Sequence, residues 1–377
     1  MQLKYSSSTA TTPTTQGQPQ KRQRHRGWLW LDALCIVLLA LCLALADLPF
    51  NPHSVEKFYA QGLYPAVAEP MMAFSSSLPF SLSAALLLLV SLGYSMFLWQ
   101  NIRKLRWLRL LRGSLYLSTV LAVSFYGLWG MNYHRLSLAE HLALQVRGIQ
   151  LEDLEALADD LLIAIERDLQ LIDVQTLDAS ALTAEVALEL TSFLQEHGIH
   201  SPTLPSTVKI LPKGSLIVSG NATGVISPWL LEAHLDGALP PSSQLMVAAH
   251  ELAHLAGFAH EADAELLATL VGLASERPEY RYAAQLKLFR FCLRDMPSAL
   301  RKRYQEALLQ AALDDWRQGL LAYERYRVPR RLERLQHRFY DSFLKSQGIS
   351  EGTASYSRGL AYVIVAREQG LVTLEGF

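Results

Sequence analysis

Three long apolar stretches near the N-terminus limit what this chain can fold into. They are "WLWLDALCIVLLALCLALA" (28–46), "LPFSLSAALLLLVSLGYSMFLW" (78–99) and "GSLYLSTVLAVSFYGLWGM" (113–131). Each holds about 19 to 22 residues, and at a helical rise of ~1.5 Å per residue each reaches roughly 30 Å, the thickness of the hydrocarbon core of a bilayer. The sequence therefore predicts three transmembrane helices, with the lipid bilayer as a partner.

The basic residues beside these stretches predict the orientation, because Lys and Arg prefer the cytoplasmic side. They precede the first stretch or lie in the expected loop between the second and third: Lys21, Arg22, Arg24, Arg26, Arg103, Lys104, Arg106, Arg109 and Arg112. The loop between the first and second stretches holds only Lys57. We therefore place the N-terminus in the cytoplasm and everything after Tyr133 outside it.

The first stretch allows a second interpretation, as a signal peptide. Ala44-Leu45-Ala46 resembles a small-residue cleavage site. The stretch is long compared with the usual apolar region of about 7–15 residues, which favours a retained span. With either interpretation the C-terminal part lies outside the cytoplasm.

Composition divides the chain into three parts. Residues 1–26 are rich in Ser, Thr and Gln and end in KRQRHR, so we expect a disordered basic tail. Residues 27–133 form the predicted membrane region, and residues 134–377 form a domain outside the cytoplasm. The formal charge of −1 argues against a nucleic-acid partner, because phosphate binding needs a clustered basic surface. Cys35 and Cys42 lie in the first stretch, so Cys292 has no disulfide partner within the domain.

The fold class predicted for the whole chain is mainly α. Apolar residues recur at three- and four-residue spacing from Leu136 to about Gly198, and again from Ser242 to the end. Between Pro202 and Pro241 short β-branched runs alternate with Gly and Pro, which predicts a small β segment.

The stretch "LPPSSQLMVAAHELAHLAGF" predicts a buried helix that contains an HExxH motif. Ser242 or Ser243 is the expected N-cap, and Gly257 is expected to end the helix. His250 and His254 are four residues apart and share one face, so both imidazoles can bind one Zn²⁺. Glu251 can deprotonate a water in the open coordination position, as amide hydrolysis requires.

Two patterns compete for the third metal ligand. The metzincin pattern HExxHxxGxxH is matched in full, and it would use His260. The gluzincin pattern uses a Glu on a following helix, and "EADAE" offers Glu261. Metzincins also need a methionine-bearing turn, whereas Met296 lies at the end of a predicted helix before Pro297. A second helix starting near Glu261 would place this carboxylate at the positive end of the helix dipole.

The motif and three further segments resemble the domain-of-unknown-function 3810 family of bacterial membrane proteins, whose motif is close to AHELAHQRGFAREDEAN. The further segments are "WGMNYHRLSLAE" (129–140), "GVISPWLLEAHLD" (224–236) and "YDSFLKSQGISEGTASYSRGLAYVI" (340–364). In the family pattern an Arg takes the position of His260 and a Glu that of Glu261. The resemblance therefore implies Glu261 as the third ligand, with His260 as the alternative. The chain departs from the pattern at Asp263, where Glu is usual, and at Glu265, where Asn is usual.

Four other residues could take part in the chemistry. A peptidase of this kind needs a donor that stabilises the oxyanion, and Tyr356 and Arg358 of the family-like C-terminal segment are candidates. Glu232 and His234 precede the predicted zinc helix and could border a substrate cleft, but we favour a structural role for both.

The sequence as a whole predicts a zincin-like domain that follows three transmembrane helices. The first functional hypothesis is a zinc metallopeptidase anchored in the plasma (inner) membrane, acting on a peptide or protein substrate. His250, His254 and Glu261 bind Zn²⁺ and Glu251 is the general base. The second hypothesis is a non-catalytic scaffold whose metal only holds helices together. A purely structural tetrahedral site would need four protein ligands and no base.

Overall fold

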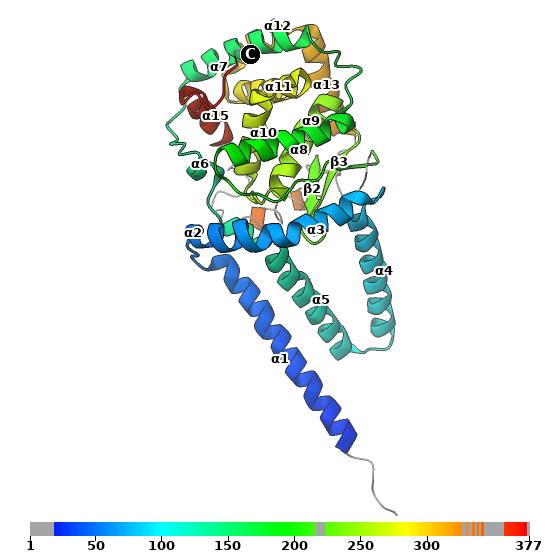
Figure 1. Cartoon of the computed structure of the whole chain (residues 1–377). Coiled ribbons are helices and arrows are strands. Elements are labelled where there is room, and N and C mark those ends of the chain that lie inside the picture. Colours follow the sequence, from blue (N-terminus) through cyan, green and yellow to red (C-terminus); the bar gives the residue numbers. More distant parts are fainter. Residues whose placement is uncertain are drawn as a thin grey trace, which may run out of the picture.

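The computed structural model describes residues 19–213, 215, 223–325 and 358–374, together with a few single positions between 329 and 342. The described chain is mainly helical with one small sheet, as predicted. Figure 1 shows a helical C-terminal domain from which three long helices extend on one side. These helices are α1 (Pro19–Asp47), α4 (Leu82–Arg103) and α5 (Trp107–Leu128). Within the described residues these are the three helices that are long and apolar enough to cross a membrane, and they coincide with the three predicted spans.

The start of α4 differs from the sequence prediction because of a cap. Ser81 has an extended backbone, and its hydroxyl accepts a hydrogen bond from the backbone N–H of Ala84 (2.9 Å). An N-cap of this kind satisfies one of the otherwise unpaired amides of the first helical turn. The helix therefore begins at Leu82 rather than at residue 78.

The basic residues expected in the loop before α5 are mostly helical. Only residues 104–106 connect the two helices, so that Arg109 and Arg112 lie in α5. Arg112 donates from Nε to Asp32 Oδ2 (2.8 Å), and the Tyr116 hydroxyl donates to Asp32 Oδ1 (2.6 Å). A carboxylate inside an apolar helix needs such partners. Because Asp32 lies on α1, these contacts join α1 to α5.

The segment between the first two spans is also helical. It consists of α2 (Pro52–Val55), the π-helix η1 (Glu56–Leu63) and α3 (Tyr64–Ser77). In Figure 1 this segment runs across the domain-side ends of the spans, between the spans and the domain. One of its faces packs into the domain core through Tyr59, Tyr64, Ala68 and Met72.

The domain core is built around α9 (Pro241–Leu255) and α10 (Glu261–Ala274), which pack against each other. Nearly every residue of α10 is buried, including the charged Asp263 and Glu265. The surrounding helices are η2 (Gly130–His134), α6 (Leu138–His141), α7 (Leu151–Leu169), α8 (Ala179–Glu196), α11 (Pro278–Asp295), α12 (Ser298–Ala307), α13 (Gln310–Arg325) and α15 (Arg358–Glu368).

The sheet lies where the sequence predicts β structure and has the strand order β1-β3-β2. The central strand β3 (Glu232–Asp236) pairs in parallel with β1 (Lys209–Leu211) and antiparallel with β2 (Gly224–Ser227). In register, Val225 of β2 faces His234 of β3. Helix α9 packs against both β2 and β3, so one end of the sheet lies beside the HExxH motif.

The helix α1 begins at Pro19, within the stretch expected to be a disordered tail. A helix that is already formed by the apolar residues extends at low cost through Lys, Arg and Gln, which are good helix formers. Residues 1–18 lie outside the described part of the chain.

Candidate metal centre

The HExxH motif lies on α9 as predicted, but the helix has another cap than expected. Pro240 is the N-cap and Pro241 the first helical residue, a position where proline's missing N–H costs nothing. Ser242 is inside the helix and donates to Asp315 Oδ2 (2.6 Å). The helix ends as predicted, because Gly257 takes a φ of 98° just after it.

Three side chains converge at the C-terminal half of α9 and the start of α10. His250 and His254 come from α9, and Glu261 is the first residue of α10. One ligand atom from each lies within 4.8 Å of the other two. Glu261 Oε2 is 3.0 Å from His250 Nε2 and 3.6 Å from His254 Nε2. Among the described residues, this group could therefore hold a metal ion.

The spacing of these atoms fits a tetrahedral cation. Ligand atoms about 2.0–2.1 Å from a zinc ion at tetrahedral angles are roughly 3.3 Å from one another. The two distances from Glu261 lie on either side of that value. Two imidazoles and one carboxylate are also a donor set that Zn²⁺ accepts in catalytic sites, where a fourth position stays open.

The other nitrogen of His254 is fixed by the backbone. His254 Nδ1 lies 2.7 Å from the carbonyl oxygen of Phe258, which accepts its proton. With Nδ1 donating to the backbone, the neutral imidazole has its lone pair on Nε2, the nitrogen that lies 3.6 Å from Glu261 Oε2, as a metal ligand requires. The two imidazole rings are nearly perpendicular (89°), with centroids 4.7 Å apart.

His250 is backed by a carboxylate and a lysine. His250 Nδ1 lies 3.4 Å from Glu265 Oε2, and Lys287 Nζ from α11 lies 2.7 Å from the same oxygen. Carboxylate support of a metal-binding imidazole orients the ring and raises its basicity. This chain has Glu265 where Asn is usual in the family pattern, and Lys287 neutralises the charge that Glu265 adds.

The buried charges of this group depend on one another. Burial opposes the charged form of His250, but the hydrogen bonds and charges of Glu261 and Glu265 outweigh it and raise the pKa of His250 to about 10. Burial likewise opposes ionisation of Glu261, yet the charge of His254 and the contact with His250 hold its pKa well below the ordinary range. A divalent cation would replace the protons on the imidazoles, so its binding would release protons.

Glu251 lies beside the three ligands and outside their group. It is buried, and burial raises its pKa, against the opposing charges of His250 and His254. Strand β2 passes directly over this carboxylate at Gly224. A Cβ atom at Gly224 would overlap Glu251 Oε1 and Val247. Glycine at this position therefore lets the strand approach the HExxH helix.

His260, the alternative third ligand, points elsewhere. Its Nε2 lies 2.9 Å from the carbonyl oxygen of Tyr133, and its ring packs edge-on against the Tyr133 ring (86°, centroids 5.7 Å apart). The structure thus brings Glu261, and not His260, to His250 and His254. Tyr133 was not among the predicted site residues; its ring is buried, and burial with the charge of Glu261 raises its pKa.

Glu232 and His234 have the structural role that we favoured. Glu232 accepts hydrogen bonds from the first amides of α4, those of Leu82 (3.0 Å) and Ser83 (2.7 Å). His234 Nε2 lies 2.8 Å from the Ser81 hydroxyl. Burial opposes the charge on Glu232, but His234 and these donors lower its pKa to about 2. The second span is therefore tied to the central strand β3.

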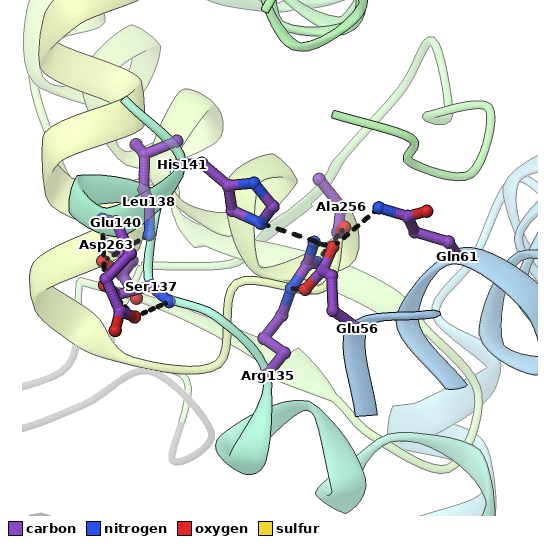
Figure 2. Close-up of polar contacts among 9 residues, drawn as sticks. All are labelled: Glu56, Gln61, Arg135, Ser137, Leu138, Glu140, His141, Ala256 and Asp263. Carbon is purple, nitrogen blue, oxygen red and sulfur yellow. Dashed lines mark hydrogen bonds and ion pairs between the residues drawn. The ribbon is translucent and has the colours of Figure 1, made fainter. Parts of the chain in front are cut away.

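The carbonyl groups at the end of α9 are held by residues near the membrane helices. The Tyr64 hydroxyl donates to the carbonyl of Leu255 (2.7 Å), and Trp129 Nε1 donates to that of His254 (3.4 Å). Figure 2 shows Arg135 between the carbonyl of Ala256 and the carboxylate of Glu56. Sequence reasoning missed this support, although Trp129 and Arg135 lie in the family-like segment 129–140.

The two predicted oxyanion donors are not placed in this site. Tyr356 lies outside the described residues. Arg358 is the first residue of α15, which packs against α10, but its side chain is also outside the described part. Their proposed role stays a prediction.

The fold and site define a class: a membrane protein whose helical domain carries an HExxH helix and a candidate metal centre. The chain belongs to the family described as "Protein of unknown function (DUF3810)", whose sequence profile matches residues 59–364. This confirms the resemblance drawn from the motifs. No curated protein and no solved structure matched the chain.

Proposed function

We propose that the chain is a zinc metallopeptidase anchored in the plasma membrane, with its helical domain outside the cytoplasm. The observation that carries the proposal is the convergence of His250, His254 and Glu261, with Glu251 buried beside them on the helix that carries both histidines. The metal-binding part of the site needs only these three ligands, and the fourth position of a zinc ion would be open to water.

A zinc ion bound there would act as a Lewis acid and lower the pKa of its water to about 7. Glu251 is the residue that would take a proton from a water in the open position and return it to the leaving amine. A general base works best with a pKa near the working pH, and burial shifts the pKa of this carboxyl upward, in that direction. Glu265 and Phe258 hold the two imidazoles in orientation. Tyr356 or Arg358 would stabilise the oxyanion.

The experiment that tests the proposal replaces Glu251 with Gln. Glu251→Gln keeps the shape and leaves the three ligands in place, so zinc per chain should equal that of the wild type. Hydrolysis of a fluorogenic peptide library by the reconstituted protein should fall by about 10²–10⁴-fold. The exposed Glu276→Gln is the matched control and should retain full activity. A Glu251→Gln variant as active as the wild type would exclude the mechanism.

The scaffold hypothesis predicts a different coordination. It needs a fourth protein ligand, and Glu265, the carboxylate next to His250, is paired with Lys287. X-ray absorption at the zinc edge counts the nitrogen and oxygen ligands. Three protein ligands and a water support the peptidase, whereas four protein ligands support the scaffold.

A further inference from the structure

The segment α2–η1–α3 has two apolar faces, of which the domain covers only one. Its covered face includes Tyr64, Ala68 and Met72. On the opposite face large apolar side chains are exposed: Phe58 (70%), Leu63 (54%) and Phe74 (61%). The residues on this face between Leu63 and Phe74 are also without charge: Ala66, Pro70 and Ala73. From residue 57 to residue 77 the sequence holds only two charged residues, Lys57 and Glu69. A helix in water would carry polar residues there.

The uncovered face is directed toward the side on which the spans extend. In Figure 1 the segment lies between the domain and the three long helices α1, α4 and α5. Its face opposite the domain is therefore on the side of these helices. The Tyr59 hydroxyl donates to the carbonyl of Gly127 (3.4 Å), near the end of α5. The segment therefore lies at the level where the third span leaves the hydrocarbon region.

A second part of the domain also contacts α5, further from the end of that helix than the segment does. Trp229, in the turn between β2 and β3, donates from Nε1 to the carbonyl of Leu121 (3.2 Å) and has its ring centroid 6.3 Å from that of Phe125. Leu121 lies about two turns before the end of α5, roughly 10 Å along the helix axis. Tryptophan is enriched at the interface between membrane and water, where its ring is apolar and its N–H finds a partner.

We infer that α2–η1–α3 is an interfacial helix: the face with Phe58, Leu63 and Phe74 inserts into the lipid of the membrane that the three spans cross, and Trp229 is a second anchor. The occupant is lipid because the face is continuous with the lipid-facing side chains of the neighbouring segments. Leu48, just after α1, and Phe80, just before α4, are both exposed (49% and 53%). Amphipathic helices of this kind bury their apolar face about 5–10 Å deep in the headgroup region.

The position of this segment also sets the distance between the candidate metal centre and the membrane. Tyr64, on the covered face of the same segment, is hydrogen-bonded to Leu255, the residue after His254. A helix with its side chains is about 10–12 Å in diameter. The metal ligands therefore lie roughly one helix diameter above the lipid contact.

The test measures depth and does not depend on activity. Phe58→Cys, Leu63→Cys and Phe74→Cys are made one at a time in the full chain with Cys35, Cys42 and Cys292 replaced by Ala. Each variant carries a nitroxide spin label in vesicles of phosphatidylcholine and phosphatidylglycerol. Ile163→Cys is the matched control, because Ile163 is as exposed as Phe58 (70%) and belongs to α7, which Figure 1 shows on the side of the domain away from the spans. All four label positions are exposed, so labelling leaves the core intact. The buried Cys35, Cys42 and Cys292 are replaced in the three variants and the control alike, so these substitutions do not affect the comparison.

Collisions with oxygen, which concentrates in lipid, are compared with collisions with a water-soluble nickel chelate. We expect an oxygen-to-nickel ratio several times higher at the three segment positions than at Ile163. Equal ratios at all four positions would place the face in water and overturn the inference. Protection from both reagents, with spin–spin broadening between chains, would place a second copy on this face and would also overturn it.

Discussion

Lys287 Nζ lies 2.7 Å from Glu265 Oε2, the oxygen that also faces His250 Nδ1. Burial opposes the charge on Glu265, but Lys287 and His250 together lower its pKa to about 2, so the carboxylate stays ionised behind the imidazole. Losing such support typically weakens metal binding about 10–100-fold. We expect Glu265→Gln to raise the zinc dissociation constant by that factor in competition with a chelator.

The control for Glu265 is a pair with the same chemistry and no contact with the site. Glu306 pairs with Lys302 on the surface of α12 at 3.7 Å. Glu306→Gln should leave the zinc dissociation constant unchanged. Equal affinities for Glu265→Gln and the wild type would show that the pair only packs α10 against α11.

The identity of the third ligand is tested by zinc content. Glu261→Ala removes an atom that lies 3.0 Å from His250 Nε2, so zinc per chain should fall from about one toward zero after dialysis against a weak chelator. His260→Ala removes the hydrogen bond with the carbonyl of Tyr133 and the contact with its ring, neither of which involves the three ligands, and should retain its zinc. Elemental mass spectrometry measures both. The reverse pattern would make His260 the ligand.

The ion pair of Glu56 and Arg135 should carry much of the stability of the junction between domain and spans. Arg135 Nη2 and Nε lie 2.7 and 3.0 Å from the carboxylate oxygens, and both residues are buried. Removing one partner of a buried pair costs about 3–5 kcal/mol, because the other charge stays buried without compensation. Arg135→Ala should therefore lower the melting temperature sharply. Arg294→Ala, from an exposed pair with Asp295, should change stability by about 0–1 kcal/mol.

The lowered pKa of Glu56 predicts how the stability of the fold depends on pH. Burial would raise the pKa of Glu56, but His141 and Arg135 lower it from the ordinary 4.5 to about 2. Because the folded-state pKa is the lower one, this stabilisation is complete above pH of about 4.5 and is lost as the pH falls toward 2. Glu56→Gln should be less stable at pH 7, and its stability should fall less between pH 5 and pH 3, measured by tryptophan fluorescence. A parallel loss in variant and wild type would contradict this assignment.

Gly224 should matter for activity and not for metal binding. A methyl group there would push against Glu251 and Val247, so Gly224→Ala has to displace either β2 or Glu251, the proposed general base. A displacement of about 1 Å at a catalytic group can cost roughly 10²-fold in rate. We expect kcat/KM to fall by that order while zinc per chain is unchanged. Gly148→Ala is the control, since its Cβ would meet only Gln150, at 3.8 Å.

Local patterns in the sequence were sufficient to predict the spans, the small sheet and the HExxH helix. What they could not reveal depended on partners far along the chain. Ser242 looked like a cap but donates to Asp315, and Arg112 looked like a loop residue but pairs with Asp32. The apolar face of α2–η1–α3 was missed because the π-helix η1 interrupts the helical period of its apolar residues.

Support for the metal site was equally hard to see in advance. Lys287 lies on the next helix, and nothing in its own surroundings connects it with Glu265. Trp129 and Tyr133 belong to a segment that resembles the family, but their contacts with His254 and His260 require the fold to bring η2 against α9.

The hydrogen bonds from Leu82 and Ser83 to Glu232 attach the first turn of α4 directly to the central strand of the sheet. A span that is longer or shorter than the local hydrocarbon thickness tilts to match it. Any such tilt would move the first turn of α4 and, through its hydrogen bonds, the strand β3. Strand β2, which pairs with β3 and lies over Glu251, would move with it. A change in bilayer thickness would then move the strand that lies over the Glu251 carboxylate. The lipid composition chosen for reconstitution is therefore itself an experimental variable.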